Sequence, residues 1–440
     1  MKDLKYNLLF KTSLIVLIAL LLLIPSAMIE ELIYERENTQ QEAVMEVSSK
    51  WSTQQTLTGP ILSIPFYRYV KQISKKDSAE KIVQLKEHIH FLPEALSING
   101  TLNPEKRNRG IYEIVVYNSN INFSGSFNNI DFKSYDINPK DIMFDKAFIS
   151  VGIDDLRGIE KQILFNWNNE SVSFNPGAVS NDIVISGINA NINLDMKEKT
   201  AYEFSFDLDL KGSQKLHFVP IGKITDINLK SEWNNPSFNG AFLPDERFVD
   251  KKGFTAHWNI LHLNRNFPQS WIGSNQSVKN SAFGVDLLLP VDNYQKSTRT
   301  IKYSILFIVL TFMVFFFVEI LNKKFIHPIQ YILVGFALII FFSLLLAISE
   351  HIKFNIAYII SAISTLALVT AYVKSILKSN KIAFLISGVL TILYTFIFVI
   401  IQLQDYALLI GSIGLFIILA LVMYFSRKID WYNINLAENN

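Results

Sequence analysis

The stretch 303-YSILFIVLTFMVFFFVEIL-321 decides the architecture, because Glu319 is the one acidic or basic residue in it. An α-helix rises about 1.5 Å per residue, so about 20 apolar residues cross a hydrocarbon core about 30 Å thick. The stretch therefore predicts a transmembrane helix over 303–321.

Four further apolar stretches follow it, and each is closed by polar or charged residues. They cover 329–348, 354–373, 382–401 and 406–425. Backbone N–H and C=O groups in hydrocarbon must find partners within their own segment, so these stretches are predicted to be helices. The short links between them make consecutive helices antiparallel neighbours.

A sixth apolar stretch lies near the N-terminus, where no charged residue occurs from 12 to 29. The basic residues before it also suit a secretory signal peptide. However, the stretch is long for a signal peptide, and Ser26-Ala27-Met28 is a poor cleavage site. We therefore expect an uncleaved anchor over 12–29 and six transmembrane helices in all.

The basic residues beside the spans predict the orientation of the helices, because short cytoplasmic loops are enriched in Lys and Arg. With the N-terminus inside, ten lie on the cytoplasmic side: Lys2, Lys5, Lys11, Lys323, Lys324, Lys374, Lys378, Lys381, Arg427 and Lys428. Three lie on the outer side: Arg299, Lys302 and Lys353. Both termini, 1–11 and 426–440, are therefore predicted to be cytoplasmic, and 30–300 periplasmic, in a bacterial inner membrane.

The region 30–300 begins as a helix and then changes its hydrophobic period. Residues 30–51 are polar, helix-compatible and free of Gly and Pro, which predicts that the anchor helix continues outward. Beyond them, apolar and polar side chains alternate, as in 202-YEFSFDLDL-210. Alternation is typical of an antiparallel sheet with one buried and one wet face.

Turn-forming residues are expected to separate the strands. They are Gly59-Pro60, Asn99-Gly100, Asn175-Pro176-Gly177, Asn234-Asn235-Pro236 and Asn239-Gly240. The sequence thus predicts an α+β membrane protein, in which a large antiparallel β-rich, sandwich-like domain is inserted after the first of six transmembrane helices.

The composition of the 440-residue chain agrees with this division. Charged residues make up 18% of the chain and hydrophobic residues 50%, whereas soluble domains contain about 25% charged residues. A formal net charge of +2, without a basic patch, argues against nucleic-acid binding. The absence of cysteine excludes disulfides, thiolate metal sites and cysteine nucleophiles.

The β-rich region contains few candidates for chemistry. His88 and His90 lie two apart and would share a strand face. They could begin a zinc or copper site, but no third ligand can be named, and a polar strand face is the favoured interpretation. Asp154-Asp155 could form a catalytic pair, as could Asp207 with Asp209, but solvated acids are favoured for both. Motifs for a serine nucleophile, a P-loop, a zinc protease or a dinucleotide fold are absent, so no enzyme, metal or cofactor is expected.

Ionisable residues beside hydrocarbon are candidates for function, because charges there are costly. Glu319 has Lys323 at i+4, and an interfacial ion pair between them is favoured over a buried functional acid. His327 opens the next span and could reach back to Glu319. Glu350 and His351 lie at the outer end of that span, where they could couple membrane and β-rich domain or cap the helix. The candidate positions are therefore Glu319, His327, Glu350 and His351.

Short segments across the whole chain match one known family. Around the spans they are Ile301–Leu306, Leu310–Met313, Phe317–Glu319, His327–Tyr331, Leu333–Gly335 and Leu346–His351. Elsewhere they are Leu57–Pro60, Phe91–Glu94, Arg109–Tyr112, Asn235–Phe238, Phe242–Pro244 and Ile429–Tyr432. The chain thereby closely resembles the CreD inner-membrane proteins. The resemblance implies a link to cell-envelope integrity, colicin tolerance and a two-component regulatory system, and it offers no catalytic residues to carry over.

Together these observations predict a non-enzymatic inner-membrane protein that binds or senses something in the periplasm and contributes to envelope integrity. Its expected partners are the lipid bilayer and either another envelope protein or a periplasmic ligand, with no nucleic acid. Two alternatives stay open. A lipid-sized groove among the last five helices would favour a transporter or permease-like subunit for an envelope lipid or small molecule. A cleft uniting Asp154, Asp155, His88 or His90 would favour a membrane-bound periplasmic hydrolase.

Overall fold

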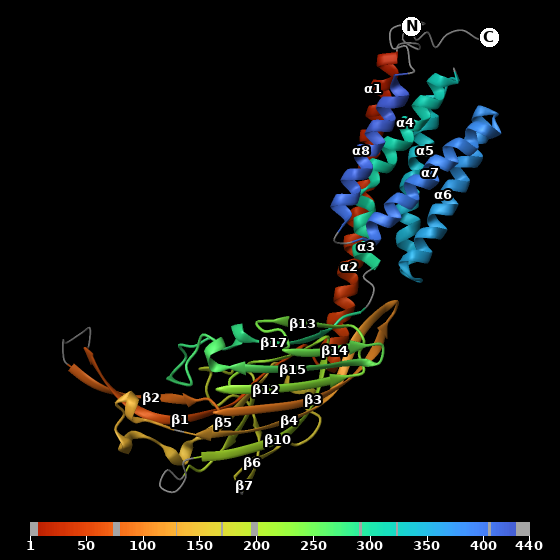
Figure 1. Ribbon diagram of the computed structural model, residues 1–440. Coiled ribbons are helices and arrows are strands. Elements are labelled where there is room, and N and C mark those ends of the chain that lie inside the picture. The colour runs from red at the N-terminus through yellow and green to blue at the C-terminus, as the bar shows by residue number, and fades with distance from the viewer. Residues whose placement is uncertain are drawn as a thin grey trace. The chain divides into compact units, whose positions relative to one another are not determined.

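A computed structural model describes residues 8–73, 80–128, 130–168, 170–194, 201–289, 293–322, 324–403 and 406–427. The chain divides into two compact units. The membrane unit comprises 1–41 and 291–440, and the β domain comprises 42–290. Six apolar helices and two large sheets, with the sheets inserted after the first helix, confirm the predicted α+β membrane protein (Figure 1).

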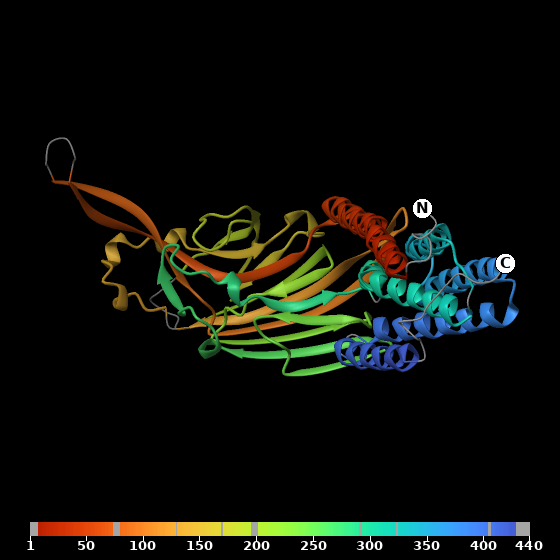
Figure 2. The same ribbon diagram turned by 90° about the horizontal axis from the view of Figure 1, so that it is seen from above.

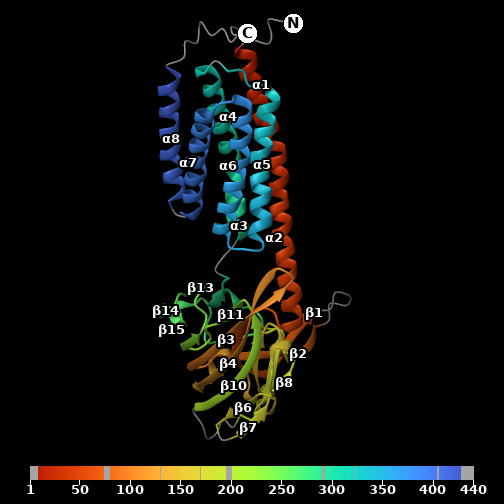
Figure 3. The ribbon, with the colours of Figure 1, turned by 90° about the vertical axis from the view of Figure 1, so that its right-hand side faces the viewer.

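The membrane unit contains six helical segments long and apolar enough to cross a bilayer, within the described residues (Figure 3). The first combines α1 (Leu8–Leu21) with α2 (Leu23–Trp51), which starts in the membrane unit and ends in the β domain. The others are α4 (Ser304–Leu321), α5 (Pro328–Ser349), α6 (Phe354–Leu377), α7 (Asn380–Gln402) and α8 (Ala407–Ser426). A short helix, α3 (Asn293–Lys302), precedes α4.

Within the membrane unit, helix α5 contacts α1, α3, α4 and α6. Its Gly335 allows the junction between α1 and α2 to approach closely, because a Cβ atom there would lie 2.2 Å from Cδ1 of Leu22, the residue between these two helices. Small residues permit such approaches between helices that pack in lipid. Aromatic rings fill the other side, where the ring centroid of Tyr394 lies 4.6 Å from Phe307 and 4.9 Å from Phe341.

The first sheet of the β domain has nine strands. Its spatial order is β13-β17-β11-β1-β5-β9-β8, with β2 paired to β1 and β16 paired to β2. The strands are β1 (Gln55–Ile73), β2 (Glu80–Phe91), β5 (Phe148–Ile153), β8 (Asn175–Pro176), β9 (Gly187–Asn191), β11 (Lys215–Phe218), β13 (Pro236–Gly240), β16 (Ser270–Ile272) and β17 (Phe283–Leu287). The far ends of β1 and β2 project from the domain as a two-stranded ribbon (Figure 2).

The second sheet has eight strands in the order β14-β15-β12-β3-β4-β10-β6-β7. They are β3 (Ala95–Arg109), β4 (Tyr112–Asn128), β6 (Leu164–Trp167), β7 (Glu170–Ser173), β10 (Ala201–Ser213), β12 (Ile224–Ser231), β14 (Glu246–Asp250) and β15 (Gly253–Leu261). Short 3-10 helices lie in the connections at Lys133–Tyr135, Pro139–Asp141, Phe144–Lys146, Leu156–Gly158, His262–Asn264 and Lys279–Ser281.

One hydrophobic core receives side chains from both sheets. The alternating stretch in β10 buries its apolar positions, among them Phe204 and Phe206, as the period-two pattern requires. Phe206 stacks on Phe123 of β4 with the ring centroids 4.6 Å apart. Opposite them, Leu62 and Val151 of the first sheet are fully buried in the same cluster. The two sheets therefore form a sandwich around one core.

Two details of the sequence prediction were wrong. The sheets are mixed rather than wholly antiparallel, because β1 pairs with β11 and β3 with β12 in parallel. In addition, Asn99-Gly100 lies inside β3 and Gly59-Pro60 inside β1, so neither is a turn between strands. The space around Gly100 is occupied by the buried side chain of Leu229, which explains a glycine within a strand.

Candidate functional site

Glu319 of α4 is 1% exposed and lies in a closed cluster of polar groups. Lys11 of α1 forms an ion pair with its carboxylate. Tyr331 of α5 donates its hydroxyl to Glu319 Oε2 at 3.0 Å, and the Ile326 N–H donates to Oε1 at 3.2 Å. The predicted partner, Lys323, lies outside the described residues, and sequence reasoning missed Lys11, 308 residues away.

His327 has a local role at the start of α5. Its Nδ1 accepts the N–H of Ile329 at 3.3 Å, while its own N–H donates to Gln330 Oε1 at 3.0 Å. Pro328 occupies the first turn, where a missing N–H has no cost. The hydrogen bonds that His327 makes to described residues are thus those of a helix cap. The Glu319 carboxylate, which His327 could have reached, accepts the backbone N–H of Ile326.

Glu350 lies at the other end of α5 in a second polar cluster. Tyr294 of α3 donates its hydroxyl to Glu350 Oε1 at 3.1 Å, and Arg36 of α2 lies 3.8 Å from the same oxygen. Asn293 donates to the carbonyl of Ser349 at 2.6 Å. The adjacent His351 is exposed.

The two clusters lie at opposite ends of the apolar part of α5. Tyr331 and Glu350 are nineteen residues apart on this helix, which corresponds to about 28 Å of helical rise. That length matches the hydrocarbon core of a bilayer, about 30 Å. Each cluster also ties the N-terminal helix to the rest of the membrane unit, through Lys11 at one end and Arg36 at the other. The Glu319 cluster and the Glu350 cluster therefore each connect the N-terminal helix to other helices, one at each end of the apolar part of α5.

His88 and His90 of β2 share one carboxylate, that of Asp182. His88 Nδ1 lies 3.0 Å from Asp182 Oδ2, and His90 Nε2 lies 3.3 Å from the same oxygen. Burial lowers the pKa of His90 to about 4, so its imidazole is neutral at neutral pH. In the described part of the chain, no group of three His, Cys, Asp or Glu residues has an arrangement that could hold a metal ion.

Ser63 completes a chain of hydrogen bonds in the order of a serine-protease triad. Its Oγ lies 2.8 Å from His90 Nδ1, on the opposite side of the ring from Asp182. However, Ser63 and His90 are each 2% exposed. The hollow beside them has a volume of ≈ 10 Å³, which is about the space of one water molecule. This arrangement does not admit a substrate.

The acidic residues considered for hydrolysis lie elsewhere. Asp155 accepts the Thr53 N–H at 2.9 Å and is paired with Arg157, whose guanidinium holds the pKa of Asp155 well below its usual range. Asp154 is paired with Lys279. Along β1, Leu57 is paired with Ile153 and Pro65 with His88. Eight residues of strand, about 26 Å, therefore separate the histidines from these acids.

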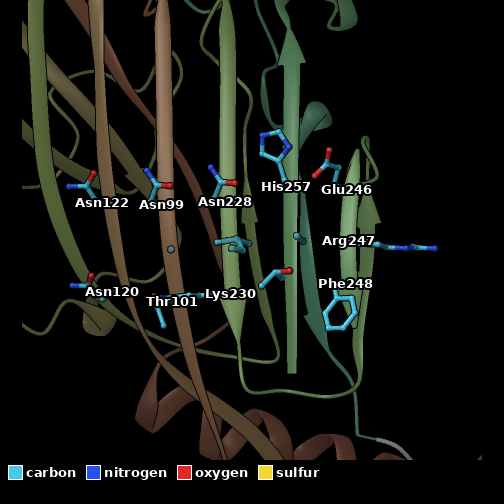
Figure 4. A pocket seen from close by; sticks show the side chains of 14 residues that line it. Asn99, Thr101, Asn120, Asn122, Asn228, Lys230, Glu246, Arg247, Phe248 and His257 are labelled. Atoms are coloured by element: carbon cyan, nitrogen blue, oxygen red, sulfur yellow. The ribbon is translucent and has the colours of Figure 1, made fainter. Parts of the chain in front are cut away.

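A broad hollow of ≈ 690 Å³ lies on the solvent face of the second sheet (Figure 4). The strand register places Asn228 of β12 beside Asn99 of β3, and Asn99 beside Asn122 of β4. A second row contains Lys230, Thr101 and Asn120 on the same strands. Edge strand β14 adds Glu246, Arg247 and Phe248.

The amides of this hollow are held in place by neighbouring acceptors. Asn122 donates to Asp207 at 2.8 Å, Asn120 to Asp209 at 2.6 Å and Asn228 to Asp226 at 2.9 Å. Two acids have a further partner: His257 lies 2.8 Å from Asp226, and Lys161 lies 2.6 Å from Asp209. Period-two alternation assigned Asp207 and Asp209 to a wet face, but the asparagine row was missed because it needs the register of β12, β3 and β4.

A membrane-spanning helical unit joined to a two-sheet β domain defines a multi-pass membrane protein with a large extramembrane domain. Sequence comparison then gives the family: the chain belongs to the CreD family, whose model, described as inner membrane protein CreD, matches residues 7–432. The chain is 33% identical over 425 residues to inner membrane protein CreD of Escherichia coli (strain K12), with 95% of this chain and 92% of that protein covered. It is thus a multi-pass inner membrane protein.

Solved structures offer a weak similarity. An M1 zinc metallopeptidase from Deinococcus radiodurans matches with a TM-score of 0.19 and 8% identity, over 38% of each chain. A mutant of the same enzyme matches with a TM-score of 0.18 and 7% identity, again over 38% of each chain. Likeness at this level carries no functional argument.

Proposed function

We propose that the protein contributes to the integrity of the bacterial cell envelope by binding a periplasmic ligand at its β domain, without catalysis. The observation that carries the proposal is the broad polar hollow on the second sheet, lined by Asn99, Asn122 and Asn228. Membership of the CreD family supports an envelope setting. The ten basic residues predicted on one side of the spans, against three on the other, support a cytoplasmic location for both termini and a periplasmic one for the β domain.

The contrast between the hollow and the other polar clusters supports binding as the role of the β domain. Glu319, Glu350 and His90 are buried or largely buried and are occupied by partners within the protein. The amides of Asn99 and Asn228 face solvent instead. An amide has two donor hydrogens and an acceptor oxygen, so these side chains keep hydrogen-bonding capacity for a ligand.

Deletion of the gene and complementation test the proposal. Cells that lack the protein are expected to become more sensitive to detergents and β-lactams, and the unaltered gene should restore resistance. An Asn99→Leu/Asn122→Leu variant should reach the membrane in normal amounts but fail to restore it. The matched control is Asn108→Leu, because Asn108 is an exposed asparagine on the same strand but outside the hollow. Unchanged sensitivity after deletion would refute the envelope role.

The orientation has its own test. A reporter that is active in the cytoplasm and is fused after Asn440 should be active, and an epitope inserted near Asn175 should react with antibody once the outer membrane is opened. An exported C-terminus would overturn the proposed topology and with it the periplasmic ligand.

A second candidate function, binding of a lipid by the helices, is favoured by one observation. A hollow of ≈ 420 Å³ lies between α4, α7 and α8. Apolar side chains line almost all of it, among them Phe317, Leu393 and Ile418. Such a space suits an acyl chain, as expected of a transporter or permease-like subunit for an envelope lipid.

Filling this hollow tests the second candidate. Ile418→Trp should reduce photo-crosslinking to an acyl chain that carries a diazirine. Leu408→Trp, at a side chain 87% exposed on the same helix, is the control and should leave crosslinking unchanged. Equal crosslinking in both variants would remove the lipid site.

A further inference from the structure

The hydrogen-bonding groups in the sheet hollow form a regular array. Asn228, Asn99 and Asn122 lie side by side on three adjacent strands, with His257 and Glu246 continuing the row toward the edge (Figure 4). Neighbouring strands are about 4.8 Å apart, so the row presents one polar group at each such interval. An extended ligand with repeating polar groups fits such a row better than a compact one.

The array offers hydrogen-bond acceptors, and the aspartates beside it are engaged within the protein. Asn122, Asn120 and Asn228 each direct the amide nitrogen to an aspartate, which leaves the amide oxygen free to accept from a ligand. The aspartates are themselves engaged by these amides, and Lys161 and His257 contact two of them. A ligand rich in neutral donors matches this surface, and hydroxyl groups are such donors.

The edge of the hollow adds an aromatic surface. Phe248 of β14 is 64% exposed beside Thr255, its cross-strand partner, and Lys230 lies one strand further along the same row. The Phe248 ring lines the hollow together with the polar groups. It can pack against the apolar face of a sugar ring while the hydroxyls at the ring edge reach polar side chains.

From this combination we infer that the hollow binds a neutral glycan chain, with Asn99, Asn122 and Asn228 as hydrogen-bonding residues and Phe248 as the stacking residue. The inference rests on the proposed function and names the class of its ligand. Polyanions are not favoured, since the cations Lys230 and Arg247 of the hollow stand beside Glu246 and close to Asp207, Asp209 and Asp226, so the surface has no large excess of positive charge to attract them. The apolar side chains of a hydrophobic peptide would leave the amide oxygens of Asn122 and Asn228 without donors.

Direct binding measurements on the full-length protein test the inference. The protein should be held in nanodiscs or a zwitterionic detergent, because detergents with sugar headgroups would compete. The probes are a hexamer of β-1,4-linked N-acetylglucosamine and a hexamer of β-1,4-linked glucose. Saturable binding of at least one is expected in isothermal titration calorimetry. Polyphosphate and a neutral polar peptide of similar length should not bind.

Variants locate the site. Asn122→Leu should weaken the binding of the hexamer about tenfold, which corresponds to the loss of one or two hydrogen bonds. Phe248→Ala should weaken it severalfold without changing the melting temperature. The control Asn108→Leu should bind as tightly as the unaltered protein.

The outcomes separate this inference from the proposed function. If neither glycan binds, or if Asn122→Leu binds as tightly as Asn108→Leu, the glycan site is refuted. Binding of polyphosphate or peptide in place of glycan would also refute it. If the hollow variants then still fail to restore envelope resistance, the proposed function stands with another ligand. Unchanged sensitivity of the deletion strain refutes the function whatever the glycan result.

Discussion

The polar groups of the membrane unit and those of the second sheet differ in where they find hydrogen-bond partners. Glu319 is enclosed by Lys11, Tyr331 and the Ile326 backbone, with each contact made inside the protein. In contrast, Asn99 and Asn228 are exposed and line a hollow on the solvent face of the sheet. Hydrocarbon offers no partner for a polar group, so a charged residue there needs one within the fold. Water places no such demand, and polar groups can be kept available for a ligand.

The largest effect is expected at the enclosed ion pair. Lys11→Met leaves the Glu319 carboxylate buried without its cation, which should cost about 3–5 kcal/mol of stability. Thermal unfolding of the purified protein in detergent measures it. The double variant Lys11→Met/Glu319→Leu should recover much of the loss, because it removes both charges. A single variant as stable as the unaltered protein would show that the cluster is not closed.

His90 extends the comparison to an enclosed group within the β domain. Its pKa of about 4 lies below the ordinary value of 6.5, so the unfolded chain takes up this proton before the folded one. Stability should therefore fall as the pH drops from 6.5 to 4, by roughly 3 kcal/mol from this group, and be intact above pH 6.5. Fluorescence of Trp271, whose ring centroid lies 5.8 Å from that of His90, can follow unfolding. His90→Gln should remove this part of the pH dependence, and an unchanged profile would contradict it.

An intermediate loss of stability is expected at Asp155, and the adjacent Asp154 provides the control. Asp155→Asn should cost about 2 kcal/mol at neutral pH, because charged hydrogen bonds to Arg157 and Thr53 are lost. Since its pKa is lowered in the fold, the stabilisation is present above the unfolded pKa, about 3.9, and is lost as the pH falls below it. Asp154→Asn, which breaks a partly exposed pair with Lys279, should cost less than about 1 kcal/mol. Equal costs in urea unfolding would contradict the distinction.

A smaller effect is expected for the ion pair at the second cluster. The Arg36 side chain is 47% exposed and lies 3.8 Å from Glu350. Arg36→Gln should lower the free energy of unfolding by at most about 1 kcal/mol. A loss as large as that of Lys11→Met would mean that the two ends of the membrane unit are equally enclosed.

The smallest effect belongs to the open face. Asn99→Ala should alter stability by less than about 0.5 kcal/mol, because the side chain is exposed. The same change should reduce ligand binding. A large destabilisation in chemical unfolding would assign the asparagine row to structure rather than to binding.

Sequence patterns predicted the helices and strands better than the contacts between residues that lie far apart in the chain. The apolar stretches of α4 to α8 and the alternating stretch of β10 are recognisable because lipid or a core imposes its period on each residue separately. The turn expected at Asn99-Gly100 failed because Leu229, distant in the sequence, fills the space beside Gly100. The third member of the histidine cluster, Asp182, was also beyond reach, since no local pattern connects it to β2.

By itself, the sequence determined that six helices are apolar enough for a membrane and that a β-rich domain is inserted after the first, since the length and period of apolar residues are local properties. Only the tertiary structure decided that Lys11 meets Glu319 and that asparagines from three strands form one row. Such meetings depend on helix packing and strand register, which join residues far apart in the chain. The ion pair and the asparagine row therefore depend on long-range geometry that local hydrophobicity does not encode.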